Sequence, residues 1–555
     1  MRSASSTTTG SCWRVCPKKT SLNAVAAPIA QAGSPGFILT VATEHGQVQL
    51  PLRAGTSLRD VLIANGFPIR SACGGNGSCG QCQVRVSGGS GIATAERQWL
   101  SAAQLDAGLR LACCVFPDKD MHVAIEYPVE QMAWRAMRED EYCNLPQVAR
   151  PLSDGVRYAV AIDLGTTHIR LTLWDLFSAT RIAGLAGLNP QASYGADVLT
   201  RLMQAVRSSD AAKTMGSLVQ NAIAEAFAIL ATQTSIGPDR IGRVMIVGNT
   251  AMLSLLSGRN YEQLLQPENW TRRIDCGPQD TASLRAAWGL DAAAEIRFIS
   301  AVGGFIGSDL LAGVIATRLI ELPAGSLLID FGTNSEMALW DGRTLHVTSA
   351  AGGPAFEGSG ISCGMPGEAG AIYRVDQADD GFFIRVLGDA AAKGLCGSGL
   401  VDAVAWLLRN GRLDRVGRFT DRNSTGFLLC EGVELKSGDI DVLQRAKAAI
   451  GAGVQWLCKQ AGMSVRDLHR VYACGAFGRL LGVDNAIQIG LLPPVSSIRR
   501  EGNAALAGCE ALLIAAQDES AVDAVLELCR IANLAEDPAF ELLFVNNLYL
   551  QAMQE

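Results

Sequence analysis

Two stretches of the chain repeat one pattern of apolar and polar positions. Residues 160–168 read VAIDLGTTH, and residues 327–335 read LLIDFGTNS. In each stretch an aliphatic run ends in Asp, a Gly-Thr pair follows, and a second apolar run begins soon after. Apolar runs broken by a glycine turn predict a strand, a tight turn and a second strand. The chain is therefore predicted to contain this unit twice, once in each half of a duplicated domain.

Each predicted turn carries groups that can bind phosphate. Gly165 and Gly332 allow the backbone to approach a ligand closely. Asp163 and Asp330 end their strands, where a carboxylate can hold the waters of Mg²⁺ or orient an attacking water. One Asp-x-Gly turn alone is usually an ordinary hairpin. Two matching turns, in a chain with no G-x4-G-K-[ST] loop, favour a clamp in which two lobes grip one ATP. The nucleotide-binding residues predicted in the turns are Gly165, Thr166, Thr167, Gly332, Thr333 and Asn334.

A third stretch with nucleotide chemistry lies at residues 470–482, which read RVYACGAFGRLLG. A strand is predicted to end at the GAFG segment, and a helix to follow it. Small residues at such a junction allow an adenosine to approach, although the segment by itself would be interpreted as an ordinary strand–helix turn. The adenosine-binding residues are predicted to be Gly475, Ala476, Phe477 and Gly478. The three stretches together resemble the actin-like ATPase superfamily, whose phosphate and adenosine motifs they match.

Residues 37–127 are predicted to form a small β-rich unit around a cysteine loop. Three cysteines share one glycine-rich loop with the spacing Cys73-x5-Cys79-x2-Cys82, and a later RLACC segment supplies Cys113 or Cys114. Thiolates held among glycine amides are typical of an iron–sulfur cluster, because the amides donate hydrogen bonds to sulfur. A zinc site would more often use two separated C-x2-C pairs. The glycines also match G-x-G-x-x-G, but they open no helix that would bind a dinucleotide.

The cysteine loop resembles that of the vertebrate- and bacterial-type [2Fe–2S] ferredoxins. In that family the fourth ligand is the Cys of an R-L-A-C segment, which here is Cys113. The resemblance therefore implies a [2Fe–2S] cluster, with the adjacent Cys114 as the alternative fourth ligand. The implied ligands are Cys73, Cys79, Cys82 and Cys113.

Composition and charge narrow the class of protein. Hydrophobic residues make up 48% and charged residues 18% of the 555 residues, so large buried cores are expected. The formal net charge of −7 argues against a nucleic-acid partner. No window holds 18 consecutive apolar residues, and no membrane span or membrane partner is predicted. Sixteen cysteines scattered along a long chain are typical of reduced thiols, which predicts a cytoplasmic protein. Residues 1–35 lack Asp and Glu and resemble an organelle transit peptide, although a disordered tail is the favoured alternative.

Six further segments occur in order along the chain and indicate one branch of the superfamily. They read LNPQASYGADVLTRL, VGNTAM, AAGGPAFEGSGISCGM, GLCGSGLVDAVA, AKAAIGAG, and IGLLP with GNAALAGC. With the ferredoxin unit they resemble the reductive activators of corrinoid proteins, over about residues 36–550. GGPAFEG and NPQ-x2-YG-x-D are the most specific of them. The chain departs from the family after the ferredoxin unit, where about thirty residues stand in place of a linker and a small middle domain.

The resemblance implies an ATP-hydrolysing iron–sulfur oxidoreductase that returns an inactive Co(II) corrinoid protein to Co(I) for methyl transfer. Its cofactors would be a [2Fe–2S] cluster, ATP and Mg²⁺, with Asp163 and Asp330 as catalytic carboxylates. Its partners would be a corrinoid methyl-carrier protein and an electron donor, either a reductase or a ferredoxin, and a homodimer is left open. Residues 356–365 and 395–400 are the predicted docking face. The alternatives are an activator of another low-potential enzyme such as a dehydratase, a ferredoxin-fused small-molecule kinase, and a redox-sensing scaffold.

The fold predicted from these patterns is an α+β, β-grasp-like ferredoxin domain followed by a two-lobed α/β actin-like ATPase with a duplicated ribonuclease-H-like fold. The predicted order is a tail at 1–35, the ferredoxin domain at 36–127, a linker at 128–156, the first lobe at 157–300, the second lobe at 301–510, and helices at 511–555 that return to the first lobe.

Overall fold

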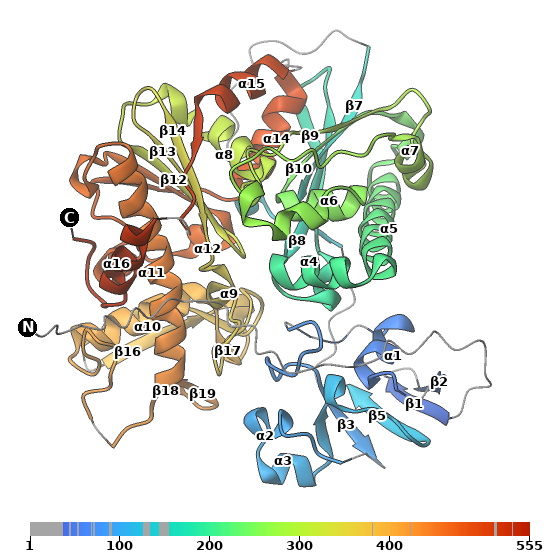
Figure 1. Cartoon of the computed structure of the whole chain (residues 1–555), viewed down its shortest axis with the longest axis vertical. Coiled ribbons are helices and arrows are strands. Elements are labelled where there is room, and N and C mark those ends of the chain that lie inside the picture. The colour runs from blue at the N-terminus through green and yellow to red at the C-terminus, as the bar shows by residue number, and fades with distance from the viewer. Residues whose placement is uncertain are drawn as a thin grey trace, which may run out of the picture.

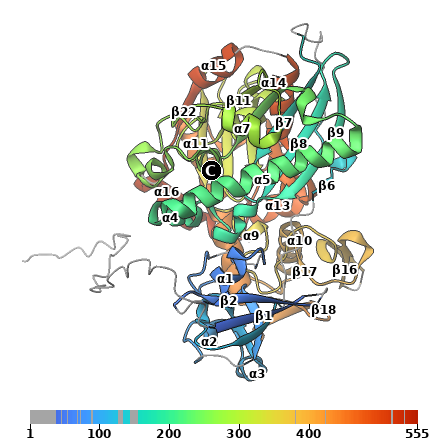
Figure 2. The ribbon, with the colours of Figure 1, turned by 90° about the vertical axis from the view of Figure 1, so that its right-hand side faces the viewer.

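The structure is a computed structural model of the chain. It describes residues 37–43, 46–52, 55–67, 69, 71, 73–87, 91–125, 134–143, 155–379, 381–421, 423–515, 519–534 and 537–554. The predicted tail at 1–35 lies outside the described residues. Two lobes stand side by side, and the N-terminal domain lies below the first lobe and beside the lower part of the second (Figure 1). The view from the side shows the same stacking (Figure 2).

The N-terminal domain is built on a five-stranded sheet in the order β2-β1-β5-β3-β4. The first and last strands pair in parallel at the centre, and the other pairs are antiparallel, as in a β-grasp fold. Alternation buries Leu39 and Val41 on one face of β1, where Leu58 and Leu62 of α1 cover them. The elements are β1 Phe37–Thr43, β2 Gly46–Leu52, α1 Leu58–Ala64, β3 Gln83–Ser87, α2 Glu96–Trp99, α3 Ala102–Asp106, β4 Leu109–Leu111 and β5 Met121–Ile125.

The first lobe has a six-stranded mixed sheet in the order β11-β10-β7-β8-β9-β6. Its central strand β7 is buried along its whole length, as expected for a strand covered on both faces. Helices α4 to α7 cover one side of the lobe. The elements are β6 Arg135–Ala136, β7 Tyr158–Leu164, β8 His168–Asp175, β9 Thr180–Leu188, α4 Val198–Arg207, α5 Ser209–Thr234, β10 Ile241–Gly248, α6 Thr250–Ser257, α7 Ala282–Trp288 and β11 Glu295–Phe298.

The second lobe repeats this sheet, in the order β21-β20-β12-β13-β14-β22. In each lobe an antiparallel three-stranded meander is followed, beside its first strand, by two parallel strands. This repetition confirms the predicted duplication. The sheet and its helices are β12 Ser326–Phe331, β13 Ser335–Trp340, β14 Leu345–Ala350, α9 Gly353–Phe356, α10 Gly397–Arg409, α11 Ser437–Gln460, β20 Arg470–Cys474, α12 Gly475–Leu480, α13 Val483–Ile489 and β21 Ser497–Arg500. Two small sheets are added, formed by β15 Ala371–Ala378, β16 Gly381–Val386 and β17 Gly394–Leu395, and by β18 Gly426–Cys430 and β19 Val433–Lys436.

Two helices join the lobes. Helix α8, Ser308–Thr317, contacts strands of both sheets and packs along α14, Ala504–Ala515. Helix α14 also lies on β7 and β10 of the first lobe. There the buried Glu510 accepts hydrogen bonds from Thr172 at 2.7 Å and from Arg181 at 2.7 Å. The hinge between the lobes is therefore a packed helix pair with a buried, paired charge.

The chain ends on the second lobe, which differs from the prediction for residues 511–555. After α15, Glu519–Leu528, the strand β22, Cys529–Ile531, pairs in parallel with β14. Helix α16, Pro538–Asn547, then packs on α11. The physical reason is that β14 would otherwise leave a free sheet edge, and β22 supplies its missing partner. Helix α14 covers the first lobe although most of it lies in the range predicted for the second, and α15 accepts a hydrogen bond from Arg273 of the first lobe at the carbonyl of Leu526.

The linker also takes part in the fold. Within it, β6 pairs with β9 as the sixth strand of the first sheet. The Trp134 ring lies against Gly187, and the Arg181 guanidinium lies 4.1 Å from the ring centre of Tyr142. The described linker residues are thus part of the first lobe.

Among the described residues, α5 is the one helix long and apolar enough to cross a membrane by length and composition. Its apolar face, which includes Met215, Ile223 and Phe227, is buried in the core of the first lobe.

Candidate functional site

The cysteine loop folds tightly beneath one tryptophan. Its glycines Gly74, Gly75, Gly77 and Gly80 all have positive φ, which glycine adopts without strain. A Cβ on Gly80 would lie 2.8 Å from the Trp99 ring, so that position has no room for a side chain. The Trp99 indole also donates to the carbonyl of Gly77 at 3.2 Å. The glycines therefore let the loop curl closely around its own thiols.

The thiols of the loop form two close pairs. The Sγ atoms of Cys82 and Cys113 are 3.4 Å apart, and Cys79 hydrogen-bonds to Cys73, which lowers the pKa of Cys73 to about 4. The bond with Cys82 lowers the pKa of Cys113 to about 7, whereas burial raises that of Cys114 to about 12. No three His, Cys, Asp or Glu side chains in the described ranges converge as a site for a single metal ion. Two close thiol pairs fit a two-iron cluster, and the 3.4 Å approach of Cys82 to Cys113 favours Cys113 over Cys114.

The two repeated turns touch each other across the lobes. Both copies are antiparallel hairpins, β7 with β8 and β12 with β13, as the pattern predicts. The hydroxyls of Thr167 and Thr333, one from each turn, lie 2.9 Å apart. Asn189 of the NPQ segment supports the first turn by donating to the carbonyl of Gly165 at 2.9 Å. Segments more than 160 residues apart therefore form one polar site.

The aspartates of the two turns are close enough to interact electrostatically, but they contact different side chains. Asn503 donates to Asp163 at 2.5 Å, and an Arg170 Nη1 lies 3.7 Å from the same carboxylate oxygen. Burial raises the pKa of Asp163, which Arg170 and Asn503 oppose. Burial and the charge of Asp163 raise the pKa of Asp330 to about 7. Asp309 of α8 also has its pKa raised to about 7, by burial and by both aspartates.

A further carboxylate, Glu357 of the GGPAFEG segment, joins the two turns. It accepts from the hydroxyls of Thr167 at 2.9 Å and Thr333 at 3.2 Å. Burial raises its pKa, against the effect of the two hydroxyls and of the Arg201 charge. Arg201 is fully buried and donates to the carbonyl of Gly195 at 2.8 Å. Sequence reasoning missed both residues as site residues, although each lies within a segment that carries the family resemblance.

The GAFG segment closes one side of the same site. Gly475 has φ +87°, and a Cβ there would lie 2.6 Å from the carbonyl of Phe331 and 3.0 Å from Asp330. The Phe477 ring stacks on Phe356 with centroids 4.6 Å apart and meets Phe331 edge-on at 5.2 Å. Three aromatic rings therefore hold the second turn, the GGPAFEG segment and the GAFG segment together. Ala476 is exposed and Gly478 is buried.

The predicted docking face is corrected in part. Phe356, Ile361, Leu395 and Leu400 are buried in the core of the second lobe, whereas Gly360 and Ser362 are exposed. The buried residues cannot contact a partner protein without unfolding that core, and a role of the exposed ones stays a prediction. The specific pattern of the buried residues reflects packing around α10 rather than an exposed surface.

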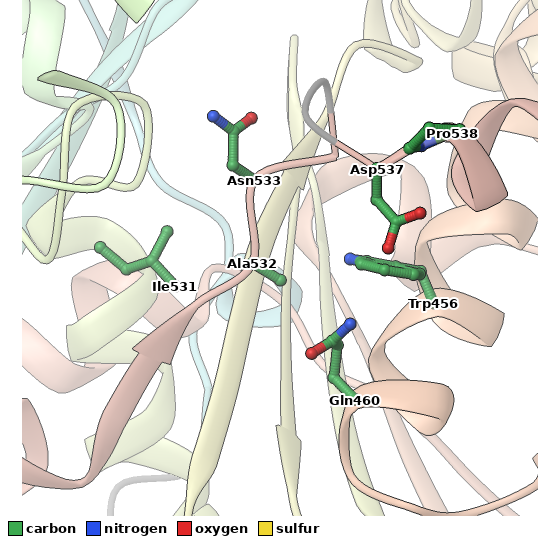
Figure 3. A pocket seen from close by; sticks show the side chains of 7 residues that line it. All are labelled: Trp456, Gln460, Ile531, Ala532, Asn533, Asp537 and Pro538. Carbon is green, nitrogen blue, oxygen red and sulfur yellow. The ribbon is translucent and has the colours of Figure 1, made fainter. Parts of the chain in front are cut away.

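Two cavities accompany these sites. One of about 270 Å³ lies between the cysteine loop and both lobes, and is lined by Cys73 and Cys79 on one side and by Thr200, Pro354 and Ser359 on the other. The other, of about 460 Å³, lies on the second lobe beside α11 and the segment after β22. Figure 3 shows Trp456 and Asp537 pointing toward one another in it. No predicted site residue lines this second cavity.

Comparison with known proteins agrees with this architecture. Residues 42–118 match a family described as a 2Fe-2S iron-sulfur cluster binding domain. Residues 158–321 match the RACo middle region, and residues 324–555 match the C-terminal domain of RACo, the ASKHA domain. The corrinoid activation enzyme RamQ of Eubacterium limosum is 30% identical over 427 residues, which cover 70% of each chain. This chain is a member of the corrinoid activation enzyme family.

Other relatives agree with the activator assignment. A Methanosarcina barkeri protein named as a reductase of a Co(II) methylated amine-specific corrinoid protein is 27% identical over 406 residues, 67% of the activator and 72% of the relative. A solved reductive activator for a corrinoid, iron-sulfur protein has the same fold, with a TM-score of 0.61 and 24% identity over 93% of the activator and 99% of that chain. The predicted class, an ATP-dependent iron–sulfur oxidoreductase, is thereby confirmed. The activator carries a [2Fe–2S] domain and a nucleotide-binding ASKHA domain.

The comparison corrects one sequence inference. The short linker suggested that a small middle domain was missing, but the family's middle region matches residues 158–321. That range coincides with the sheet and helices of the first lobe. The middle region is therefore present and forms the first lobe itself. For that reason the sequence shows no separate inserted domain before the first lobe.

Proposed function

We propose that the activator uses ATP to drive an electron from its [2Fe–2S] cluster to a Co(II) corrinoid protein, which regenerates Co(I). Two relatives are named for corrinoid activation and for reduction of a Co(II) corrinoid protein. The observation that carries the ATP-dependent part is the contact between Thr167 and Thr333, because it brings both repeated turns to one place. Phosphate oxygens are bound by such clustered hydroxyl and amide donors.

The two cysteine pairs, Cys73 with Cys79 and Cys82 with Cys113, would hold the cluster. The bound cluster supplies one-electron chemistry at low potential. An external reductase or ferredoxin must supply each electron, since one is lost for every Co(II) reduced. Trp99 and the glycine turns shield the thiols on one side.

The turns and their partners would hold ATP with Mg²⁺. Thr167 and Thr333 donate to phosphate oxygens from the two lobes. Asp163 would orient the attacking water, and the charge of Arg170 3.7 Å away opposes the rise in its pKa that burial causes. Asp330 orients the waters of Mg²⁺, whose charge would offset the repulsion between the two aspartates. The GAFG segment beside Asp330 would hold the adenosine.

ATP is needed because the transfer is uphill. Each ~59 mV in a one-electron potential changes the equilibrium about tenfold. Plant-type [2Fe–2S] clusters reach only about −400 mV, whereas a Co(I) corrinoid is itself a strong reductant. A partner that docks on the closed lobes can receive part of the free energy of nucleotide binding, because the closed form is the one it selects.

The direct test measures Co(I) formation from Co(II) corrinoid proteins by absorption spectroscopy. Co(I) should accumulate only with ATP, Mg²⁺ and an electron donor together, and the corrinoid partner should accelerate ATP turnover. Equal Co(I) formation without ATP, for every corrinoid protein tried, would contradict the proposal.

A matched pair of variants tests the cluster ligands. Cys113→Ser should abolish or strongly alter the visible cluster spectrum, as should Ser at each of the other three ligand positions, whereas Cys114→Ser should leave it largely intact. The reverse result would make Cys114 the fourth ligand. The electron donor, a homodimer, the domain boundaries and a cytoplasmic location stay predictions of the sequence.

A further inference from the structure

Glu357 occupies the position where nucleotide phosphates are proposed to bind. Its carboxylate takes hydrogen bonds from Thr167 and Thr333, the hydroxyls assigned above to phosphate oxygens. Each hydroxyl has one proton to donate, so a phosphate and this carboxylate compete for the same donors. The phosphate is anionic, and an ionised carboxylate a few ångströms from it would be repelled strongly outside bulk water. Phosphate binding and the present position of Glu357 therefore exclude one another.

The segment around Glu357 packs directly on the second turn, so a shift of the glutamate would also move its neighbours. A Cβ on Gly353 would lie 2.0 Å from the carbonyls of both Gly332 and Thr333, so α9 rests directly on the second turn. Immediately after Glu357, Gly358 has φ +87°, a conformation that other residues rarely adopt. The glutamate thus sits between a tightly packed end and a glycine turn.

The same segment faces the cysteine loop. Pro354 and Ser359, on either side of Glu357, line the cavity whose opposite wall contains Cys73 and Cys79. Helix α4 also contacts the cysteine loop, because Gln204 donates to the carbonyl of Gly74 at 3.4 Å. The first lobe also receives a hydrogen bond from Arg59 at the carbonyl of Ser193. The cysteine loop is therefore seated against both lobes, directly beside the residue that bridges their two turns.

We propose that Glu357 is the positioning residue through which nucleotide binding releases the cysteine loop from the two lobes. Phosphate takes the two threonine hydroxyls and expels the carboxylate, and the Pro354–Ser359 segment shifts with it. The contacts between the cysteine loop and the two lobes then weaken, which frees the ferredoxin domain to bind a partner protein. Without nucleotide, Glu357 holds the lobes and the loop in the arrangement seen here. This inference rests on the proposed ATP site and adds the route from that site to the cluster.

The test is hydrogen exchange of the full-length, cluster-loaded protein, with and without a non-hydrolysable ATP analogue and Mg²⁺. Peptides covering residues 73–82 and 352–360 are followed by mass spectrometry. In the unmodified protein, nucleotide should speed exchange at 73–82 by about threefold or more, as expected when a local contact opens. Unchanged exchange in both segments, in protein shown to bind the analogue, overturns the inference but leaves the proposed function standing. Protein that binds no analogue overturns both.

Variants of Glu357, which bridges the two turns, test whether this residue carries the response to nucleotide. Glu357→Ala removes acceptor and charge, so the analogue should bind about tenfold more tightly and the response at 73–82 should vanish. Glu357→Gln keeps an acceptor without the charge and should lie between the two. Glu431→Gln, an exposed acid of the same lobe, is the matched control and should behave as the unmodified protein. Weaker binding in Glu357→Ala or Glu357→Gln overturns the inference and assigns Glu357 to the metal–nucleotide complex instead. Should a variant fail to fold, the exchange measurement on the unmodified protein decides alone.

Discussion

The two copies of the repeated hairpin pair in the same way but place residues of opposite charge across from their aspartates. In the first lobe Asp163 pairs in register with Arg170, and in the second Asp330 pairs with Glu336. Burial raises the pKa of Asp163, Asp330 and Glu336. The charge of Arg170 opposes this rise at both aspartates, whereas nearby aspartates add to it at Asp330 and Glu336. Duplication therefore reproduced the geometry of the turn, and divergence placed a cation opposite one aspartate and an acid opposite the other. The two carboxylates are not interchangeable.

The largest expected effect comes from removing either carboxylate. Asp163→Asn and Asp330→Asn should each lower ATP hydrolysis by about 100-fold or more, the usual scale for a lost base or metal-orienting group. The cluster spectrum should persist in both, because the ferredoxin domain folds around its own core. Phosphate release and visible absorption measure the two properties. Normal turnover in both variants would refute the two-lobed clamp.

Substitutions of Arg170 and Glu336, which pair with the two aspartates, should change the affinity for ATP in opposite directions. Arg170→Gln leaves Asp163 without its cation and should weaken ATP binding by about tenfold. Glu336→Gln removes an acid that is 6% exposed, and should tighten binding by about threefold. Isothermal titration calorimetry with a non-hydrolysable analogue compares them. Equal weakening in both variants would show that the charge asymmetry has no part in binding.

The raised pKa values predict a pH dependence of stability in protein free of nucleotide and Mg²⁺. The folded-state pKa of Asp330, about 7, lies above its unfolded value of about 3.9, so the folded state holds the extra proton between them. Its contribution to stability is present below the unfolded pKa and is lost as pH rises through 7. The unfolding temperature should fall from pH 6 to pH 8, and Asp330→Asn should reduce that fall by about 2 °C. Glu431→Gln should leave the fall unchanged, and an identical slope in Asp330→Asn would contradict the assignment.

The smallest effect concerns the contact between the two turns. Thr167→Val and Thr333→Val each remove one hydroxyl from the site that joins the lobes. Both hydroxyls donate to Glu357, so a double-mutant cycle in denaturant unfolding should give a coupling free energy of about 0.5–1 kcal/mol through the shared carboxylate. Strictly additive losses would mean that the hydroxyls do not interact through it.

Local sequence patterns predicted much of the candidate site. The repeated Asp-x-Gly-Thr stretches predicted two hairpins, and the structure contains both at the predicted positions. The spacing of Cys73, Cys79 and Cys82 predicted a shared loop, because seven or so residues rich in glycine cannot separate thiols far. Such features need only the order of nearby residues. Their period, turn chemistry and spacing are properties of a short segment.

Partners from distant segments were beyond the reach of the sequence. Asn503 meets Asp163 from 340 positions away, and Glu357 meets Thr167 from 190 positions away. The pattern GGPAFEG indicated a family but not that its glutamate would bridge two turns. The burial of Phe356 and Leu400, which excludes them as a docking face, likewise depends on how helices pack around them.

The sequence by itself determined the ferredoxin loop, the duplicated strand–turn–strand unit and the family, because each is written in contiguous residues with a definite period or spacing. The tertiary structure alone decided which charges face each aspartate, that Glu357 lies between the turns, and that the cysteine loop is seated beside it. The physical reason is that electrostatics and burial depend on distance in space. A chain of 555 residues brings together groups whose separation along the sequence says nothing about that distance.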